Sequence, residues 1–597
     1  MSYETWPSLP AMFFEQAEHR GEQPFLWAKR NNAYAPLSYG EAARNVKALA
    51  RAFVALGIES GDRIVLVAEN RPEWGIADLA IMTAGGITVP AYTTNTSRDH
   101  RHILTDSGAR AVIVSTKALA QRVMPALAEC RAVRFVVTIE PLDGGGLIDV
   151  PIHDWNNLIA AHRDENDAAF ESRLAGLERD DIACLIYTSG TGGNPKGVMQ
   201  RHESIMHNCM GANLLLQQIG LGDEVFLSFL PLSHAYEHTC GLYFPISLGG
   251  QIYYAEGVET LSANLIEARP TIMVSVPRLF EVLRARILQG AKQKGGLRFR
   301  LLNLTLSLGI KAYRAPSGLS WPTRLANQLM DRLVRRKAAE RFGGRLKAMI
   351  SGGAPLNPDV GLFFTALGLR LLQGYGQTEA APVIACNPPN RVKLHTVGPP
   401  LDGVEVKIAE DGEILVRGPL VMTGYWNDSA ASRSALRDGW LHTGDVGRFD
   451  EDGYLQITDR KRDVIVLSGG DNVAPQRLEG ILTLQAEIGQ AMAFGDRHPY
   501  VVALIVPDES FVRDWARANN RPDKLGDLAR DAGFIQALGQ AVERANRDLS
   551  SIERIKRFAL ASEPFSIDNG QMTPTMKVRR HEVLKTYGAT LEALYRS

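Results

Sequence analysis

Short apolar, β-branched runs alternate with stretches of helical periodicity between about residues 40 and 260. Runs of this kind are typical of buried strands. The stretch 38–57 repeats apolar residues roughly every 3.6 positions and ends in a glycine, which favours a helix. This alternation predicts an α/β architecture of layered sheet and helices. The predicted strands are 63–69, 88–92, 111–116, 134–139, 182–189, 224–231 and 251–255.

The pattern changes after this region. Segment 278–345 is mostly helical in its periodicity. Around 392–460 short alternating runs flank the pair Asp411-Gly412, which is a hairpin signal and predicts a small β subdomain. From Lys461 onward helix and strand patterns return and end in a charged helical tail. A chain of 597 residues exceeds the size of a single core, so two or more domains are expected.

Composition excludes several classes of protein. Apolar residues make up 45% of the chain and charged residues 22%, as in ordinary globular proteins. The five cysteines have no C-x-x-C spacing, so we expect neither a zinc site nor a disulfide framework, and a reducing cytoplasm fits best. The first residues lack a basic segment followed by an apolar core, and no apolar run reaches about 18 residues, which predicts neither a signal peptide nor a membrane span.

Charge is balanced overall but uneven along the chain. Lys plus Arg and Asp plus Glu each number 66, whereas segment 283–347 holds 16 Lys and Arg against only Asp331 and Glu340. Overall neutrality disfavours a nucleic-acid coat protein, and we expect no nucleic-acid partner. The basic segment is suited to an anionic surface or a phosphorylated cofactor.

The stretch Tyr187 to Gly197 reads YTSGTGGNPKG and directly follows a predicted strand. Glycines let the backbone turn tightly and bring N–H donors to an anion, while the hydroxyls and the lysine add further contacts. It is not a Walker A loop, because Gly197 and not Ser or Thr follows the lysine. By itself the stretch leaves an ordinary loop equally open. Its candidate phosphate-binding residues are Thr188, Ser189, Gly190, Thr191, Gly192, Gly193 and Lys196.

Further motifs follow in a fixed order. They are LPLSHAYEH (230–238), SGGAPL (351–356), QGYGQTE (373–379), DGWLHTGDVG (438–447), LQITDRKRDVIVLSGGDNVAP (455–475) and TPTMKVRR (573–580). Together with the glycine-rich stretch they resemble the conserved motifs of the AMP-forming adenylating enzymes, the superfamily of acyl-CoA synthetases, adenylation domains and luciferases, over about residues 40–585. The resemblance implies activation of a carboxylate by ATP, giving acyl-adenylate and pyrophosphate, followed by transfer to a thiol.

The resemblance implies ATP, Mg²⁺ and coenzyme A as cofactors. Thr378 would hold a phosphate oxygen, Glu379 would bind magnesium and Tyr375 would offer its ring to adenine. Asp445 would accept from the ribose hydroxyls, and Arg460 would contact ribose or the α-phosphate. Other implied nucleotide-binding residues are Gly352, Gly353, Ala354, Pro355, Gly374, Gly376, Gln377 and Ile457.

Catalysis is expected from Lys577, which would bridge the carboxylate and the α-phosphate as charge develops. His234 either gates the carboxylate pocket or is a buried core histidine, and the sequence leaves both open, as it does for Tyr236. The predicted catalytic set consists of Lys577, His234, Thr378 and Glu379.

The resemblance also places a hinge at Arg462. It implies an N-terminal ATP- and acyl-binding domain over 1–459 and a mobile α+β domain over 460–597 that rotates between half-reactions. Residues Ser468, Gly469 and Gly470 would then line the pantetheine channel.

Segment 438–462 and the helical insertion at about 283–347 resemble the long-chain fatty acyl-CoA synthetase branch, which implies a medium- or long-chain fatty acid as substrate. An aromatic or terpenoid acid, a carrier protein as acceptor, and a silent lipid-binding relative remain alternatives, and a monomer or a homodimer is expected. Gly192 replaces the usual Thr or Ser of the loop, which predicts a weaker hold on ATP.

The insertion is either a helical layer with a solvated basic face or a peripheral membrane contact on the inner face. In the second case neutralising Arg335, Arg336 and Lys337 would weaken lipid binding. The apolar side chains expected to meet lipid are Leu297, Phe299, Leu301, Leu302, Leu304 and Leu306.

Overall fold

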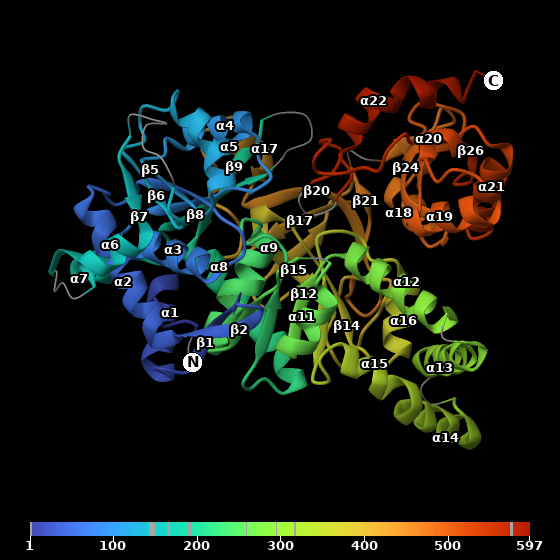
Figure 1. Ribbon diagram of the computed structural model, residues 1–597, viewed down its shortest axis with the longest axis horizontal. Helices are drawn as coiled ribbons and strands as arrows, with labels where there is room; N and C mark the ends of the chain where they lie inside the picture. The colour runs from blue at the N-terminus through green and yellow to red at the C-terminus, as the bar shows by residue number, and fades with distance from the viewer. Residues whose placement is uncertain are drawn as a thin grey trace.

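The computed structural model describes residues 3–142, 150–163, 168–188, 194–257, 259–293, 295–315, 318–461, 464–573 and 577–596. Two eight-stranded sheets lie side by side in the larger part of the molecule (Figure 1). Their central strands are parallel; both edges of the first sheet and one edge of the second are antiparallel, whereas β7 at the other edge of the second sheet pairs in parallel. One sheet has the order β15 (Val383–Cys386), β14 (Leu371–Gly376), β13 (Ala348–Ser351), β12 (Ile272–Ser275), β10 (Val225–Ser228), β11 (Gln251–Tyr254), β1 (Pro24–Arg30) and β2 (Ala33–Ser38).

The second sheet carries the glycine-rich stretch on one of its strand pairs. Thr188, at the end of β8, lies opposite Lys196, at the start of β9, so the stretch between them connects two antiparallel strands. Its order is β18 (Gly424–Tyr425), β9 (Lys196–Arg201), β8 (Ile182–Thr188), β4 (Ile87–Pro90), β3 (Arg63–Val67), β5 (Ala111–Val114), β6 (Phe135–Thr138) and β7 (Ile152–Asp154).

Helices cover both sheets, and one apolar cluster joins side chains of α2, α3 and α8 to both sheets. Ser38 caps α2 and Thr96 forms a capping box at α4, which explains why those helices begin there. The helices are α1 (Leu9–Arg20), α2 (Tyr39–Ala55), α3 (Pro72–Thr83), α4 (Ser97–Ser107), α5 (Lys117–Leu127), α6 (Trp155–His162), α7 (Ala168–Ala175), α8 (His202–Leu216), η1 (Gln217–Ile219), α9 (Ala235–Glu237), η2 (His238–Tyr243), α10 (Phe244–Leu248), α11 (Leu261–Ala268), α16 (Pro358–Ala366) and η4 (Thr378–Ala380).

Two smaller units follow the predicted order. The β subdomain is an antiparallel sheet, and its first hairpin turns at the predicted Asp411-Gly412 pair. The insertion is helical, as predicted. The β subdomain contains β16 (Glu405–Ile408), β17 (Glu413–Arg417), α17 (Ser429–Ala435), β19 (Leu436–Arg437), β20 (Trp440–Phe449) and β21 (Leu455–Arg460), and the insertion contains α12 (Pro277–Gln293), α13 (Gly296–Arg314), α14 (Trp321–Met330), η3 (Asp331–Arg335) and α15 (Arg336–Arg341).

The C-terminal residues from 464 form a separate α+β body with apolar clusters of their own (Figure 1). A three-stranded sheet lies at its centre. Its elements are β22 (Ile465–Val466), β23 (Asn472–Val473), α18 (Pro475–Leu482), β24 (Ile488–Phe494), β25 (Val501–Pro507), α19 (Glu509–Ala518), α20 (Leu525–Leu528), α21 (Ala532–Asn546), β26 (Ile555–Leu560) and α22 (Arg580–Ala593).

The α/β class and the β subdomain are thus confirmed. Each predicted strand is present, as β3, β4, β5, β6, β8, β10 and β11. Among the described helices, none combines the length and apolar character needed to cross a bilayer.

Candidate active site

A cavity of about 1720 Å³ separates the sheets, the β subdomain and the C-terminal body. Several of its walls are the carboxyl ends of parallel strands, and the segments after β12, β13 and β14 all line it. Parallel strands end at one edge of a sheet, and ligands of α/β proteins bind there. The topology therefore gathers motifs that are far apart in the sequence.

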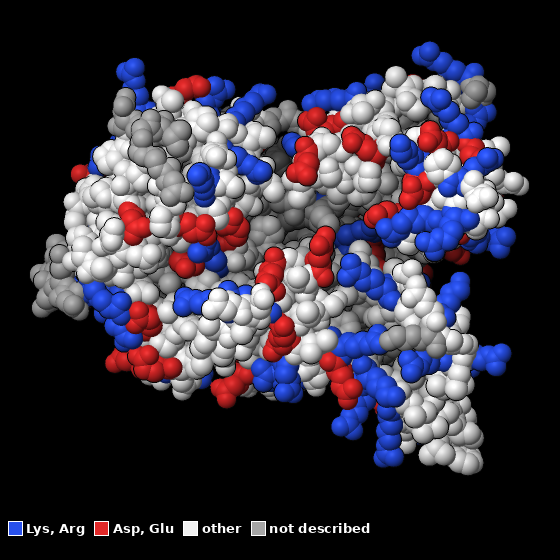
Figure 2. Space-filling view, viewed as in Figure 1, with Lys and Arg blue, Asp and Glu red and all other residues white. Residues whose placement is uncertain are grey.

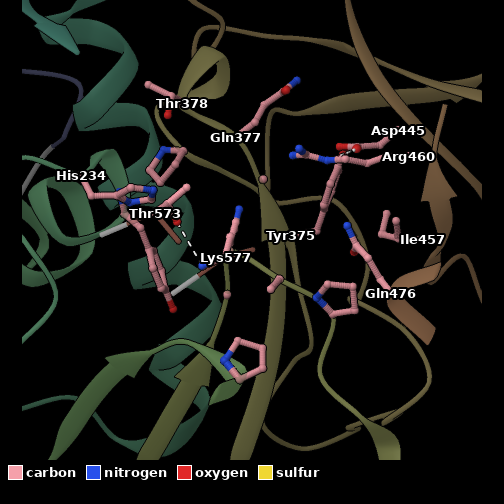
Figure 3. A pocket seen from close by; sticks show the side chains of 18 of the residues that line it. His234, Tyr375, Gln377, Thr378, Asp445, Ile457, Arg460, Gln476, Thr573 and Lys577 are labelled. Carbon is pink, nitrogen blue, oxygen red and sulfur yellow. Dashed lines mark hydrogen bonds and ion pairs between the residues drawn. The ribbon is translucent and has the colours of Figure 1, made fainter. Parts of the chain in front are cut away.

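A carboxylate and two partners form one end of the cavity (Figure 3). Asp445 is almost fully buried, and its Oδ2 accepts from the Tyr375 hydroxyl at 2.7 Å. Its Oδ1 accepts from Nε of Arg460 at 3.1 Å. Burial and the neighbouring carboxylate raise the pKa of Tyr375, so this phenol stays protonated and donates. Register explains the pairing, because Asp445 on β20 lies opposite Arg460 on β21.

The SGGAPL segment forms an adjoining wall. Gly353 has φ +79°, a conformation that favours glycine. A Cβ on Gly352 would lie 3.0 Å from the ring of Tyr236, so the missing side chain permits this close packing. The Tyr236 hydroxyl donates to the carbonyl of Ile350 at 3.0 Å. Tyr236 therefore both lines the cavity and has a satisfied hydroxyl.

A second carboxylate, Glu379, lies in the short helix η4 after β14. Its Oε1 accepts from the hydroxyl of Tyr425 at 2.8 Å. The ammonium of Lys196 lies 5.2 Å from the centre of the Tyr425 ring and 3.3 Å from Oδ2 of Asp428. The end of the glycine-rich stretch is thereby brought to the same corner as the predicted magnesium ligand.

Lys577 and His234 face the cavity from different domains (Figure 3). Burial, and secondarily the charge of Lys577, lowers the pKa of His234 to about 3, so the imidazole is neutral. Its Nδ1 accepts from the amide of Tyr236 at 3.2 Å, so the ring proton is on Nε2. The amide of Lys577 donates to Oγ1 of Thr573 at 3.0 Å, and its carbonyl accepts from the Thr573 amide at 2.8 Å.

Tyr236 belongs to an apolar cluster on the cavity wall, together with Cys240 and Val274. Under this wall Glu237 is fully buried, and burial raises its pKa to about 8, so the carboxyl is protonated at neutral pH. The uncharged state keeps this region free of fixed charge. The apolar lining includes Leu215, Leu216, Cys240, Phe244, Ile272 and Val274.

Comparison with known proteins matches both parts of the chain. The family model described as AMP-binding enzyme matches residues 13–426, and the model described as AMP-binding enzyme C-terminal domain matches residues 462–597. This chain belongs to the AMP-binding enzyme family. Its organisation into a large α/β part and a smaller C-terminal part is that of the family.

Among the relatives of this AMP-binding enzyme is the long-chain-fatty-acid--CoA ligase FadD15 of Mycobacterium bovis, 34% identical over 98% of this chain and 97% of the relative. Another is the peroxisomal long chain acyl-CoA synthetase 6 of Arabidopsis thaliana, 30% identical over 94% of this chain and 82% of the relative. The adenylation domain of a carboxylate reductase from Mycobacterium chelonae has the same fold, with a TM-score of 0.79, 22% identity and coverage of 100% and 92%.

Most residues predicted for the site of this AMP-binding enzyme do line one cavity. They are Thr188, Lys196, His234, Gly352, Gly353, Ala354, Pro355, Gly374, Tyr375, Gly376, Gln377, Thr378, Glu379, Asp445, Ile457, Arg460 and Lys577. Ser468, Gly469 and Gly470 do not line it and lie exposed at the turn between β22 and β23. Ser189, Gly190, Thr191, Gly192, Gly193 and Arg462 lie outside the described residues.

Sequence reasoning missed the side chains that hold these motifs in place. The amide of Gln200 donates to the carbonyl of Thr378 at 2.7 Å. Asn208, a buried polar residue within α8, donates to the carbonyls of Ala380 and Val383. An isolated amide inside a helix with an apolar face was the one signal that could have marked Asn208. The role of Tyr425 gives no such signal, because it depends on the pairing of β18 with β9.

Proposed function

We propose that this AMP-binding enzyme is a fatty acid–CoA ligase that converts a medium- or long-chain fatty acid to its acyl-adenylate and then to acyl-CoA. The supporting observation is a single cavity whose lining includes Asp445, Lys577 and Glu379 together with the apolar cluster of Tyr236, Cys240 and Val274. The relatives named as long-chain-fatty-acid–CoA ligases over nearly the whole chain support the same assignment.

The first step brings a carboxylate against a triphosphate, so negative charge must be neutralised before displacement. Lys577 would bridge the carboxylate and the α-phosphate, and Asp445 would accept from the ribose hydroxyls. Neutral His234 would donate from Nε2 to the substrate carboxylate and so gate its pocket. Thr378, Lys196 and the stretch from Thr188 to Gly193 would hold the phosphates.

Magnesium fits one corner of the cavity. Glu379 supplies one carboxylate, and Mg²⁺ typically binds one or two carboxylates together with substrate phosphate oxygens. The second carboxylate oxygen of Glu379, Oε2, is compatible with such binding, because the Tyr425 hydroxyl bonds to Oε1. Among the described residues no cluster of three or more metal-binding side chains occurs, so phosphate oxygens and water would complete the shell. When bound, the ion would neutralise charge on the leaving pyrophosphate.

The second step requires a different face of the C-terminal domain. We propose that the C-terminal domain beyond a hinge at Arg462 rotates as a unit relative to the larger domain, with which Arg460 remains through its pairing with Asp445. The exposed turn of Ser468, Gly469 and Gly470 would then line the pantetheine channel and bring coenzyme A to the adenylate.

Release of pyrophosphate over a series of carboxylic acids, with and without coenzyme A, tests this function. We expect release to rise with chain length through the medium and long fatty acids and acyl-CoA to form only with coenzyme A. Each added buried methylene contributes about 0.8 kcal/mol, so specificity should increase severalfold for every carbon that the wall accommodates. Preference for benzoate or another aromatic acid, or product that forms only on a carrier protein, would contradict the proposal.

We further propose that the insertion at about 283–347 contacts the inner face of the cytoplasmic membrane. Four exposed apolar side chains recur every four residues along α14 and η3 and so share one helical face. Figure 2 shows Lys and Arg gathered along the helical insertion. Their positive charge complements anionic lipid. The exposed fractions are 77% for Trp321, 61% for Leu325, 53% for Leu329 and 43% for Leu333.

The structure corrects part of the sequence expectation for this contact. Leu302 is buried and Leu306 packs on the neighbouring core, whereas Leu297 and Leu304 are exposed. The guanidinium of Arg335 donates to the carbonyls of Ala366 and Asn327, so neutralising it would damage folding instead of testing lipid binding.

Flotation with phosphatidylglycerol and phosphatidylcholine vesicles tests the contact. We expect binding only to the anionic vesicles. Combined replacement of exposed Arg332, Arg336 and Lys337 by Gln should weaken it roughly a hundredfold, at about 1 kcal/mol for each charge. Trp321→Ala should also weaken it, whereas Ile266→Ala, another exposed apolar position, on α11, should not. Equal binding to both lipids, or survival of binding in the triple variant, would contradict the contact.

A further inference from the structure

The C-terminal body touches the larger domain at contacts on the cavity wall that involve none of the proposed catalytic groups. Nη2 of Arg278, in the first turn of α12, donates to the carbonyl of Gly489 at 2.8 Å. Nδ2 of Asn357 donates to the carbonyl of Gly480 at 3.2 Å. Leu484 packs on the apolar cluster of the larger domain that contains Phe280. Both hydrogen bonds therefore cross between the two bodies at one edge.

The direction of the Arg278 side chain is fixed from within its own domain. Its Nη1 lies 3.0 Å from Oε2 of Glu281, one helical turn further along α12. Both side chains are partly buried. One terminal nitrogen of the guanidinium thus binds the Glu281 carboxylate, and the other binds the carbonyl of Gly489, near the start of β24. A charged donor makes this hydrogen bond stronger than a neutral one.

The amide of Asn357 is also held in one orientation. Its Oδ1 accepts from the amide of Asp359 at 2.9 Å and so caps α16. With the oxygen occupied, Nδ2 is directed to Gly480 at the end of α18. Asn357 directly follows the SGGAPL segment, so the contact is adjacent in sequence to residues of the proposed adenine site.

A chain of contacts continues from Gly489 toward Lys577. The next residue, Gln490, accepts from the Phe565 amide at 2.8 Å and donates to the Phe565 carbonyl at 3.0 Å. Its Nε2 also contacts the sulfur of Met572 at 3.4 Å, and Met572 forms a β-bridge with Val578, beside Lys577. The start of β24 is thereby linked through Met572 to Val578, the residue that follows Lys577.

We propose that Arg278 and Asn357 are positioning residues that hold the C-terminal domain in the orientation that places Lys577 in the cavity. The inference rests on the proposed two-step function. Each contact joins a side chain of the larger domain to a main-chain carbonyl of the C-terminal domain. The contacts therefore form only when the C-terminal domain has this orientation. Losing either contact destabilises this orientation, whereas the free energy of the orientation used in the second half-reaction is unchanged. The first half-reaction should therefore slow, and the second should not.

Separate assays of the half-reactions test this role. We expect Arg278→Gln and Asn357→Asp each to slow acyl-adenylate formation by roughly tenfold, as expected for loss of one hydrogen bond. Thioester formation from supplied acyl-adenylate should remain at the wild-type rate or increase. Asn357→Asp keeps the acceptor that caps α16, replaces the donor to Gly480 by a carboxylate oxygen and adds a negative charge. Arg286→Gln, an exposed position on the same helix, is the matched control and should change neither step.

The distance between spin labels on the two domains provides a readout that does not depend on substrate. Labels at Arg98→Cys and Arg497→Cys, both exposed, are suitable because the five native cysteines are buried. We expect Arg278→Gln to add a second distance population to the wild-type one. Equal loss in both half-reactions, or an unchanged distance distribution, would overturn the role. If the wild type activates no fatty acid, the proposed function fails while the distances still decide this inference.

Discussion

Replacement of Lys577 by alanine is expected to slow acyl-adenylate formation by about 10²–10³-fold, the effect of removing one group that stabilises developing charge. Lys577 faces the cavity and lies close enough to His234 for its charge to lower the histidine pKa. Thioester formation from supplied acyl-adenylate should stay close to the wild-type rate, because we propose that the second step uses the exposed turn at Ser468. Pyrophosphate exchange and acyl-CoA formation measure the two steps separately.

The matched control is Lys585→Ala. This lysine belongs to the same domain, is largely exposed and pairs only with Glu582 among the ion pairs of the described residues. It should leave both half-reactions intact. A Lys577→Ala enzyme that lost both half-reactions equally would show that the lysine supports the whole domain, or both steps, and would refute the assigned role.

Replacement of Asp445 is expected to have the second large effect, confined to the nucleotide. The buried carboxylate accepts from Tyr375 and Arg460 and would accept from ribose. Hydrogen bonds to a charged group contribute about 1.5–3 kcal/mol each. Loss of the two bonds to the ribose hydroxyls in Asp445→Ala should therefore lower kcat/KM for ATP by about 10²–10⁴-fold. Asp445→Asn preserves the size of the side chain and should show a smaller loss in the same direction.

The KM values for fatty acid and coenzyme A should change little in both Asp445 variants. Asp438→Asn is a suitable control, since this exposed carboxylate lies in the same β subdomain, does not line the cavity, and has a positive φ that asparagine tolerates. Melting temperatures would show whether unpaired Arg460 and Tyr375 destabilise the fold. An increase in KM for the acid but not for ATP would contradict ribose binding by Asp445.

The candidate site was predictable from the sequence to the extent that its motifs are local. QGYGQTE places its functional residues at the end of β14, and HTGD places Asp445 within the single strand β20, so the short-range pattern suffices. The membrane hypothesis illustrates the opposite case. Periodicity predicted helices over 278–345, but not that Leu302 packs inward or that Arg335 bonds to Ala366, because burial in a helical layer depends on which neighbouring helix covers it.

By itself, then, the sequence determined the α/β class, the hairpin at Asp411-Gly412, the helical insertion and the motif residues of the nucleotide site. These follow from periodicity, turn chemistry and short motifs, all of which act over a few residues. Only the tertiary structure decided which distant side chains meet, such as Tyr425 with Glu379 and Arg278 with Gly489. Strand order sets the first contact, and a backbone carbonyl receives the second, so neither leaves a local pattern in the amino-acid sequence.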